Sequence, residues 1–160
     1  MYDRVFLYVH SLGGCVALAV ADGEDLHAVA TTVPAIKLPW FSGLLWVLGW
    51  INMFFWRKNK EVVSDNVSYP FESLRAFRQT LFMSRHTRKN LFKISCPVLH
   101  CHSKKDAIIK PKTAFIVKEG VSGPVEIQWF DTKHTMPLDA KEGKKVSNSI
   151  ANFFNKNRAK

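Results

Sequence analysis

The stretch FLYVHSLGGCVALAVA, residues 6–21, constrains the fold more than any other part of the chain. A run of β-branched and aromatic residues, 4–9, is followed by the sequence His-Ser-Leu-Gly-Gly and then by an alanine-rich run, 15–21. An apolar run with little polar alternation is typical of a strand that is covered on both faces in a parallel sheet. The stretch therefore predicts a strand, a sharp turn at Ser11 and a short buried helix.

The same alternation continues toward the C-terminus and indicates the fold class. Residues 26–33, 96–101 and 125–130 have the composition of strands, and residues 110–120 suit a helix. Strands that alternate with helices along a chain form βαβ units around a parallel sheet. We therefore expect an α/β fold with a mostly parallel sheet of about four strands and flanking helices.

Two further helices are expected from their start signals. Ser68, before Tyr69 and Pro70, is a candidate N-cap. Asp139, followed three residues later by Glu142, resembles a capping box. The apolar stripes that would pack these two helices are Leu74, Phe77 and Leu81 in the first, and Val146, Ile150, Phe153 and Phe154 in the second.

Residues 38–56 carry no formal charge and hold four of the five tryptophans. The segment is long enough to span a bilayer. Its proline, its glycines and its place between two βα modules oppose a spanning helix. We expect residues 37–85 to form an apolar cap or lid inserted in the domain, with peripheral membrane contact through residues 38–56. A transmembrane helix is the alternative.

Composition limits the number of domains, the type of partner and the cellular location that we expect. A chain of 160 residues with 47% hydrophobic side chains suffices for one domain, residues 1–160. The formal charge of +10 favours anionic partners, but the basic residues are dispersed and lack interleaved aromatic residues, so no nucleic-acid partner is expected. Three cysteines are too few for a disulfide framework. With no secretory signal pattern, we expect a cytoplasmic location, with a peripheral position at the membrane as the alternative.

Three polar residues stand where chemistry is expected. A serine hydroxyl becomes a strong nucleophile when a histidine accepts its proton and a carboxylate orients that histidine. Asp106 follows the strand at 96–101, and His134 follows the strand at 125–130. The carboxyl ends of parallel strands share one sheet edge, so Ser11, Asp106 and His134 are expected to meet there. Asp131 and Asp139 compete with Asp106, which is favoured by its place after the strand at 96–101. The other histidines do not follow the last strand: His27, His86, His100 and His102.

The motifs HSLGG, ISCPVLHCHSKKDAIIKP and VEIQWFDTKHTMPLD resemble the α/β-hydrolase superfamily, in particular the C-terminal two-thirds of bacterial carboxylesterases and monoacylglycerol lipases. The resemblance implies a partial α/β-hydrolase fold. It also implies Ser11 as nucleophile, Asp106 as orienting acid, His134 as general base, the Leu12 N–H as an oxyanion-hole donor and Gly13 as the small residue of the nucleophile elbow. At Gly13 we expect strand and helix to approach too closely for a Cβ atom.

The same resemblance implies a reaction. It predicts a serine carboxylic-ester hydrolase that forms an acyl-enzyme intermediate on an acyl ester or a monoacylglycerol, with no cofactor and no metal. His100 and His102 are two apart in a strand and share a face, as zinc ligands do, but no further ligands stand at the spacing of a metal site.

Two departures from the pattern leave an alternative open. Val9 stands where the motif G-x-S-x-G has its first glycine, and only ten residues precede Ser11. Earlier strands and the loop that supplies a second oxyanion donor have no counterpart, so we expect a truncated domain with residues 4–9 as a free sheet edge. The alternative function is a noncatalytic remnant or interaction module that pairs, or self-associates, through that edge.

Overall fold

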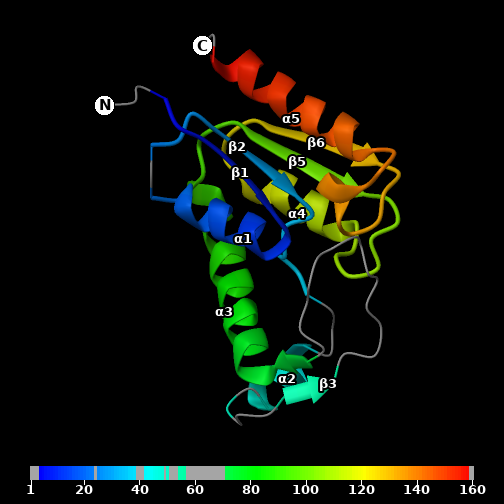
Figure 1. The fold of residues 1–160 in the computed structure, drawn as a ribbon. Coiled ribbons are helices and arrows are strands. Elements are labelled where there is room, and N and C mark those ends of the chain that lie inside the picture. Colours follow the sequence, from blue (N-terminus) through cyan, green and yellow to red (C-terminus); the bar gives the residue numbers. More distant parts are fainter. Residues whose placement is uncertain are drawn as a thin grey trace.

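The chain forms a four-stranded parallel sheet in a computed structural model that describes residues 4–23, 25–38, 42–48, 50, 54–56 and 71–158. The strand order is β1-β2-β5-β6, and all three neighbouring pairs are parallel (Figure 1). The strands are β1 (Phe6–His10), β2 (Ala28–Thr32), β5 (Val98–Ser103) and β6 (Val125–Phe130). The predicted α/β class is confirmed, with strand boundaries within two residues of those expected.

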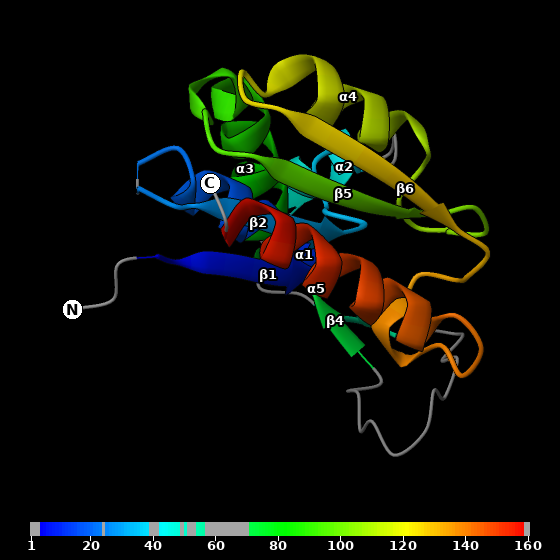
Figure 2. The ribbon, with the colours of Figure 1, turned by 90° about the horizontal axis from the view of Figure 1, so that it is seen from above.

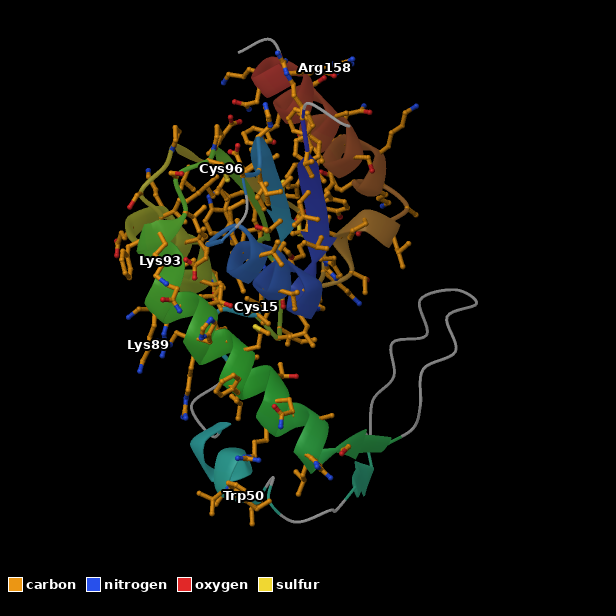
Figure 3. All side chains as sticks on the ribbon, turned by 90° about the vertical axis from the view of Figure 1, so that its left-hand side faces the viewer. Cys15, Trp50, Lys89, Lys93, Cys96 and Arg158 are labelled. Carbon is orange, nitrogen blue, oxygen red and sulfur yellow. The ribbon has the colours of Figure 1, made fainter. Side chains whose placement is uncertain are left out.

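Helices cover both faces of the sheet. Helices α1 (Ser11–Val20), α3 (Leu74–Asn90) and α4 (Lys112–Gly120) lie on one side, and α5 (Gly143–Arg158) lies on the other (Figures 1 and 2). A short 3₁₀ turn, η1 (Leu91–Lys93), follows α3, and a second, η2 (Met136–Leu138), precedes α5. Cys15 of α1 is fully buried against α3, where the Thr87 hydroxyl donates to its carbonyl oxygen at 3.1 Å (Figure 3).

The two central strands form the middle of the core. Every residue of β2 and β5 is buried, whereas the edge strands β1 and β6 are mostly half-buried. This follows from their sequences, because apolar runs without alternation suit strands that have helices on both faces. The buried aliphatic side chains of α1, α4 and α5 complete the core on the two faces.

Strand β1 forms one edge of the sheet. Within the described residues it pairs with β2 alone, and Val5 beside it is 47% exposed. The free edge expected at residues 4–9 is therefore present. An exposed strand edge presents unpaired backbone N–H and C=O groups that another strand can use.

The described parts of the apolar segment 38–56 do not form one continuous helix, which the transmembrane alternative requires. Its described parts are a short helix α2 (Ser42–Leu48), Trp50 and a strand β3 (Phe54–Trp56). Strand β3 pairs antiparallel with β4 (Phe71–Ser73). Among the helices in the described ranges, none combines the length and apolar character that crossing a bilayer requires.

The helix predicted after Ser68 begins later than expected, because strand β4 stands directly before it. Ser68 lies outside the described residues. Helix α3 begins at Leu74, and Ser73 caps it by accepting the Ala76 N–H at 3.4 Å. At the other predicted start, the Asp139 carboxylate accepts the Lys141 and Glu142 N–H groups, which is half of a capping box, and α5 follows at Gly143.

Candidate active site

Ser11 stands at the junction between β1 and α1. The strand ends at His10, in extended backbone, and the helix begins at Ser11 with φ of 52°. A left-handed φ is costly for a residue with a Cβ atom and is characteristic of sharp functional turns. This backbone turns the Ser11 hydroxyl out at the carboxyl edge of the sheet, with the helix N-terminus behind it.

The close approach behind this turn lies at Gly14, one residue later than expected. A Cβ atom on Gly14 would lie 2.9 Å from Cβ of Pro34 and 3.2 Å from its Cα. At Gly13 the nearest atoms belong to Val9 at 3.5 Å, which is ordinary contact. The expectation that a Cβ at Gly13 collides is therefore wrong, and Val9 fits beside it.

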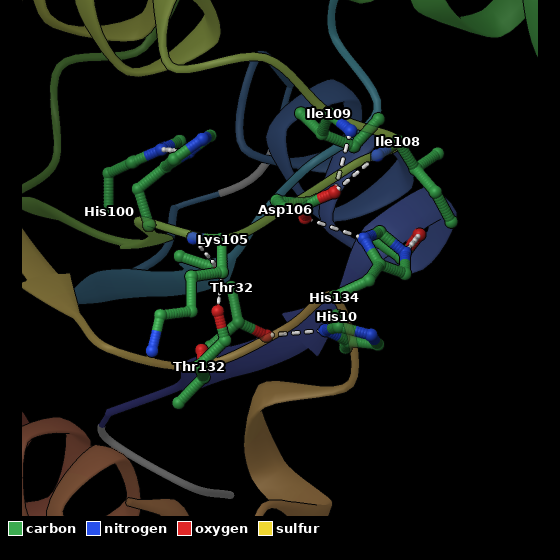
Figure 4. Close-up of polar contacts among 12 residues, drawn as sticks. His10, Thr32, His100, Lys105, Asp106, Ile108, Ile109, Thr132 and His134 are labelled. Atoms are coloured by element: carbon green, nitrogen blue, oxygen red, sulfur yellow. Dashed lines mark hydrogen bonds and ion pairs between the residues drawn. The ribbon is translucent and has the colours of Figure 1, made fainter. Parts of the chain in front are cut away.

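The other two predicted residues lie against Ser11. His134 Nε2 is 2.9 Å from Ser11 Oγ, and His134 Nδ1 is 2.7 Å from Asp106 Oδ2 (Figure 4). Asp106 follows β5 and His134 follows β6, so the parallel sheet brings their loops to the edge where β1 ends. Residues separated by 123 and 28 positions thus form one continuous hydrogen-bonded chain.

Asp106 is held as a carboxylate. Its Oδ1 accepts the N–H groups of Ile108 and Ile109 at 2.7 and 2.8 Å, and its Oδ2 faces His134. Burial raises the pKa of Asp106, but these hydrogen bonds and the nearby imidazole outweigh it and leave the pKa below its ordinary value. With its Nδ1 proton directed at the carboxylate, His134 presents Nε2 as an acceptor for the Ser11 hydroxyl.

His10 and Thr32 adjoin this group, and the sequence did not single out Thr32. His10 Nδ1 lies 2.8 Å from Thr32 Oγ1, and the His10 ring packs 5.2 Å from the ring of His134. Burial, followed by repulsion from His134, lowers the pKa of His10 to about 4. His10 is therefore neutral near pH 7 and adds no positive charge beside His134. The only sequence signal for Thr32 was its place at the end of a strand.

Leu12 is the second residue of α1. The first N–H groups of a helix have no acceptor within the helix, and the helix dipole favours negative charge beside them. The Leu12 N–H therefore belongs to the set of backbone donors available at this end of α1.

His100 and His102 form a buried pair beneath the site. Their facing ring nitrogens are 3.0 Å apart, and their rings stack at 5.3 Å. Burial lowers the pKa of both side chains, for His100 to about 3. Within the described part of the chain, no three or more His, Cys, Asp or Glu side chains are grouped in a way that would hold a metal ion.

Comparison with known proteins relates this arrangement to solved structures. No family model and no curated protein sequence matches the chain. The monoacylglycerol lipase of Paleococcus ferrophilus superimposes with a TM-score of 0.82 at 20% identity, over 96% of this chain and 69% of the lipase. The chain has an α/β-hydrolase-like fold.

Two further solved structures share this fold. A soluble variant of monoglyceride lipase from Saccharomyces cerevisiae, in complex with a substrate analogue, gives a TM-score of 0.79 at 18% identity, over 96% of this chain and 62% of that one. A structure of the metagenome-derived lipolytic enzymes LipS and LipT gives a TM-score of 0.80 at 18% identity, over 93% of this chain and 64% of that one. The chain thus spans less than two-thirds of the length of these last two relatives.

Proposed function

We propose that the chain is a serine carboxylic-ester hydrolase of the carboxylesterase or monoacylglycerol-lipase type. The hydrogen-bonded series from Ser11 through His134 to Asp106 carries this proposal. The low pKa of Asp106 supports it, because an ionised carboxylate orients the imidazole and stabilises its cation. The solved lipases that share the fold support the ester class.

In this proposal Ser11 Oγ attacks the carbonyl carbon of the ester while its proton passes to Nε2 of His134. The carbonyl oxygen becomes an oxyanion to which the Leu12 N–H donates. Cleavage of the C–O bond releases the alcohol, which takes the proton from His134. Water then attacks the acyl-enzyme, gives one proton to His134 and releases the acid, and Ser11 Oγ recovers its proton.

The substrate class is an acyl ester or a monoacylglycerol, and residues 37–85 are the cap over the acyl chain. The exposed apolar side chains of α2 support an acyl-contacting role, and they also support peripheral membrane contact through residues 38–56. Removing one oxyanion donor typically lowers a rate about 10²- to 10³-fold. The oxyanion contact of the Leu12 N–H is therefore expected to contribute to the rate on that scale.

A second candidate function rests on the free edge of β1. A noncatalytic module that pairs through this edge, with a partner strand or a second copy, would use the same exposed backbone. The exposed apolar Val5 beside the strand favours such pairing.

A fluorophosphonate probe and a p-nitrophenyl ester test the proposal. The unaltered chain is expected to be labelled and to hydrolyse the ester, and Ser11→Ala is expected to lose labelling and at least about a thousandfold in rate. Ser147→Ala is the matched control, because its hydroxyl is exposed on α5 and donates to the Gly143 carbonyl. Absence of labelling in the unaltered chain, or equal rates for Ser11→Ala, would favour the noncatalytic module.

A further inference from the structure

Helix α2 and the turn after it expose a stripe of large apolar side chains. Leu44, Val47 and Trp50 are spaced three residues apart, which places them on one side of a helical turn. They are 65%, 64% and 74% exposed. Single exposed apolar residues are ordinary, but three adjacent ones on one face mark an interaction surface.

Helix α3 supplies positive charge beside this stripe. Its sequence LRAFRQTLFMSRHTRKN holds five arginine and lysine residues and no aspartate or glutamate. Arg75, Phe82 and Lys89 are spaced seven apart and therefore lie on one face of the helix, and all three are exposed. Phe82 is 55% exposed, so this cationic face also presents an aromatic ring.

A direct contact joins the two features. The guanidinium of Arg78 lies 3.7 Å from the ring centroid of Trp50, and α2 packs against α3. Figure 3 shows Trp50 at the α2 end of the molecule and Lys89 farther along α3. We define the α2–α3 surface as Leu44, Val47, Trp50, Arg75, Phe82 and Lys89.

We propose that the α2–α3 surface docks on an anionic lipid bilayer, with the apolar residues entering the interface and the cations contacting phosphate headgroups. This deepens the membrane contact included in the proposed function. Tryptophan is favoured at the boundary between headgroups and acyl chains, and basic side chains favour anionic leaflets. A second copy fits poorly, because a two-fold contact would oppose two cationic faces. A nucleic acid is also a poor fit for this surface, because it would leave Leu44 and Val47 without an apolar partner.

Vesicle flotation tests the proposal. The full chain is mixed either with vesicles of phosphatidylcholine alone or with vesicles in which about 30% of the phosphatidylcholine is replaced by anionic phosphatidylglycerol. We expect binding to the anionic vesicles and at least tenfold weaker binding to the neutral ones. Arg75→Gln with Lys89→Gln should weaken anionic binding about thirtyfold in 0.1 M salt, at roughly fivefold for each cation, and much less in about 0.5 M salt.

The matched control is Lys141→Gln with Lys144→Gln, which removes the same charge at exposed positions in and just before α5 and should leave binding within about threefold. Leu44→Ser with Val47→Ser should weaken binding at both salt concentrations, since apolar insertion is not screened. Equal binding to both vesicle types, equal loss in the control, or binding to single-stranded RNA but not to vesicles would overturn the proposal. Fluorophosphonate labelling of Ser11 should be unchanged in Arg75→Gln with Lys89→Gln and in the lysine control, which separates this outcome from failure of the esterase assignment.

Discussion

At the scale of single residues, the candidate site depends on how one carboxylate is held. Asp106 has no freedom to rotate away, because two backbone N–H groups fix one oxygen and His134 occupies the other. These contacts make Asp106 a group whose folded-state pKa lies below its ordinary value of 3.8. Its ionised form therefore stabilises the fold above pH 3.8, and this contribution is lost as the pH falls through the lower folded value.

Asp106→Asn tests both consequences. We expect the ester-hydrolysis rate at pH 7 to fall about 10³- to 10⁴-fold, because an amide N–H facing Nδ1 favours the wrong tautomer of His134. We also expect a lower free energy of unfolding than in the unaltered chain. That difference should be constant at pH 5 and 7 in urea titrations and should shrink at pH 3. A difference that persists unchanged at pH 3 would show that the charge of Asp106 does not contribute.

At the scale of elements, the junction of α1 with the loop after β2 controls how sharply the chain turns at Ser11. Val33 in this loop has a φ of 41°, its N–H donates to Cys101, and the Ala35 N–H donates to the Ser11 carbonyl. Pro34 between them lies against Gly14. The loop and the first turn of the helix therefore fit only if the helix has no side chain at that point.

Two glycine substitutions in the same turn should have opposite effects. Gly14→Ala should lower the free energy of unfolding by about 1–3 kcal/mol, because its methyl group meets Pro34 at 2.9 Å. Gly13→Ala should raise it by roughly 0.5–1 kcal/mol, since alanine favours helix and the methyl group has room beside Val9. Thermal and urea unfolding of both variants measure this. Equal effects at the two positions would contradict the packing described for Gly14.

At the scale of the whole molecule, strand β1 is an edge of the sheet in the part of the chain that the structure describes. Strand β1 pairs on one side, and its half-buried residues Phe6, Leu7 and Val9 pack on the core with their backbone at the boundary. Covering this edge would bury Val5 and satisfy the exposed backbone groups. We therefore predict concentration-dependent association of the chain through β1.

Val5→Lys tests that association. A lysine beside an edge strand opposes strand pairing, so we expect this variant to sediment as a monomer at concentrations where the unaltered chain forms larger species. Phe115→Lys, at an exposed position on α4, is the matched control and should associate like the unaltered chain. Sedimentation velocity over a concentration series measures the outcome. Loss of association in both variants would indicate general apolar attraction rather than pairing through β1.

The sequence predicted the sheet and the three polar residues because their signals are local and one rule of topology joins them. Each apolar run marked a strand, and the common direction of parallel strands placed Ser11, Asp106 and His134 at one edge. The turn formed by Asp106 with Ile108 and Ile109 was also readable in principle, since aspartate often accepts N–H groups two and three residues ahead.

Features that depend on contacts between distant segments were not predicted. Strand β4 forms by pairing with β3, which is distant in the sequence. Because the sequence alone does not reveal this pairing, it could not distinguish Ser68 from Ser73 as the start of the helix. The glycine that must lack a side chain is Gly14 rather than Gly13 because of Pro34, which belongs to another loop. Thr32 gains its importance from His10, 22 residues away. None of these partners can be identified from spacing in one sequence.

The left-handed backbone at Ser11 lowers the stability of the fold, whereas the proposed reaction needs the serine hydroxyl at this position. A side chain at such a φ costs about 1–2 kcal/mol, and glycine escapes most of that cost. Mutational drift in a lineage that had stopped using the hydroxyl would therefore run toward glycine at position 11. If serine is retained at position 11 in diverged descendants, it is retained although glycine would be more stable there. The amino acid at this position therefore indicates whether selection still acts on the hydroxyl.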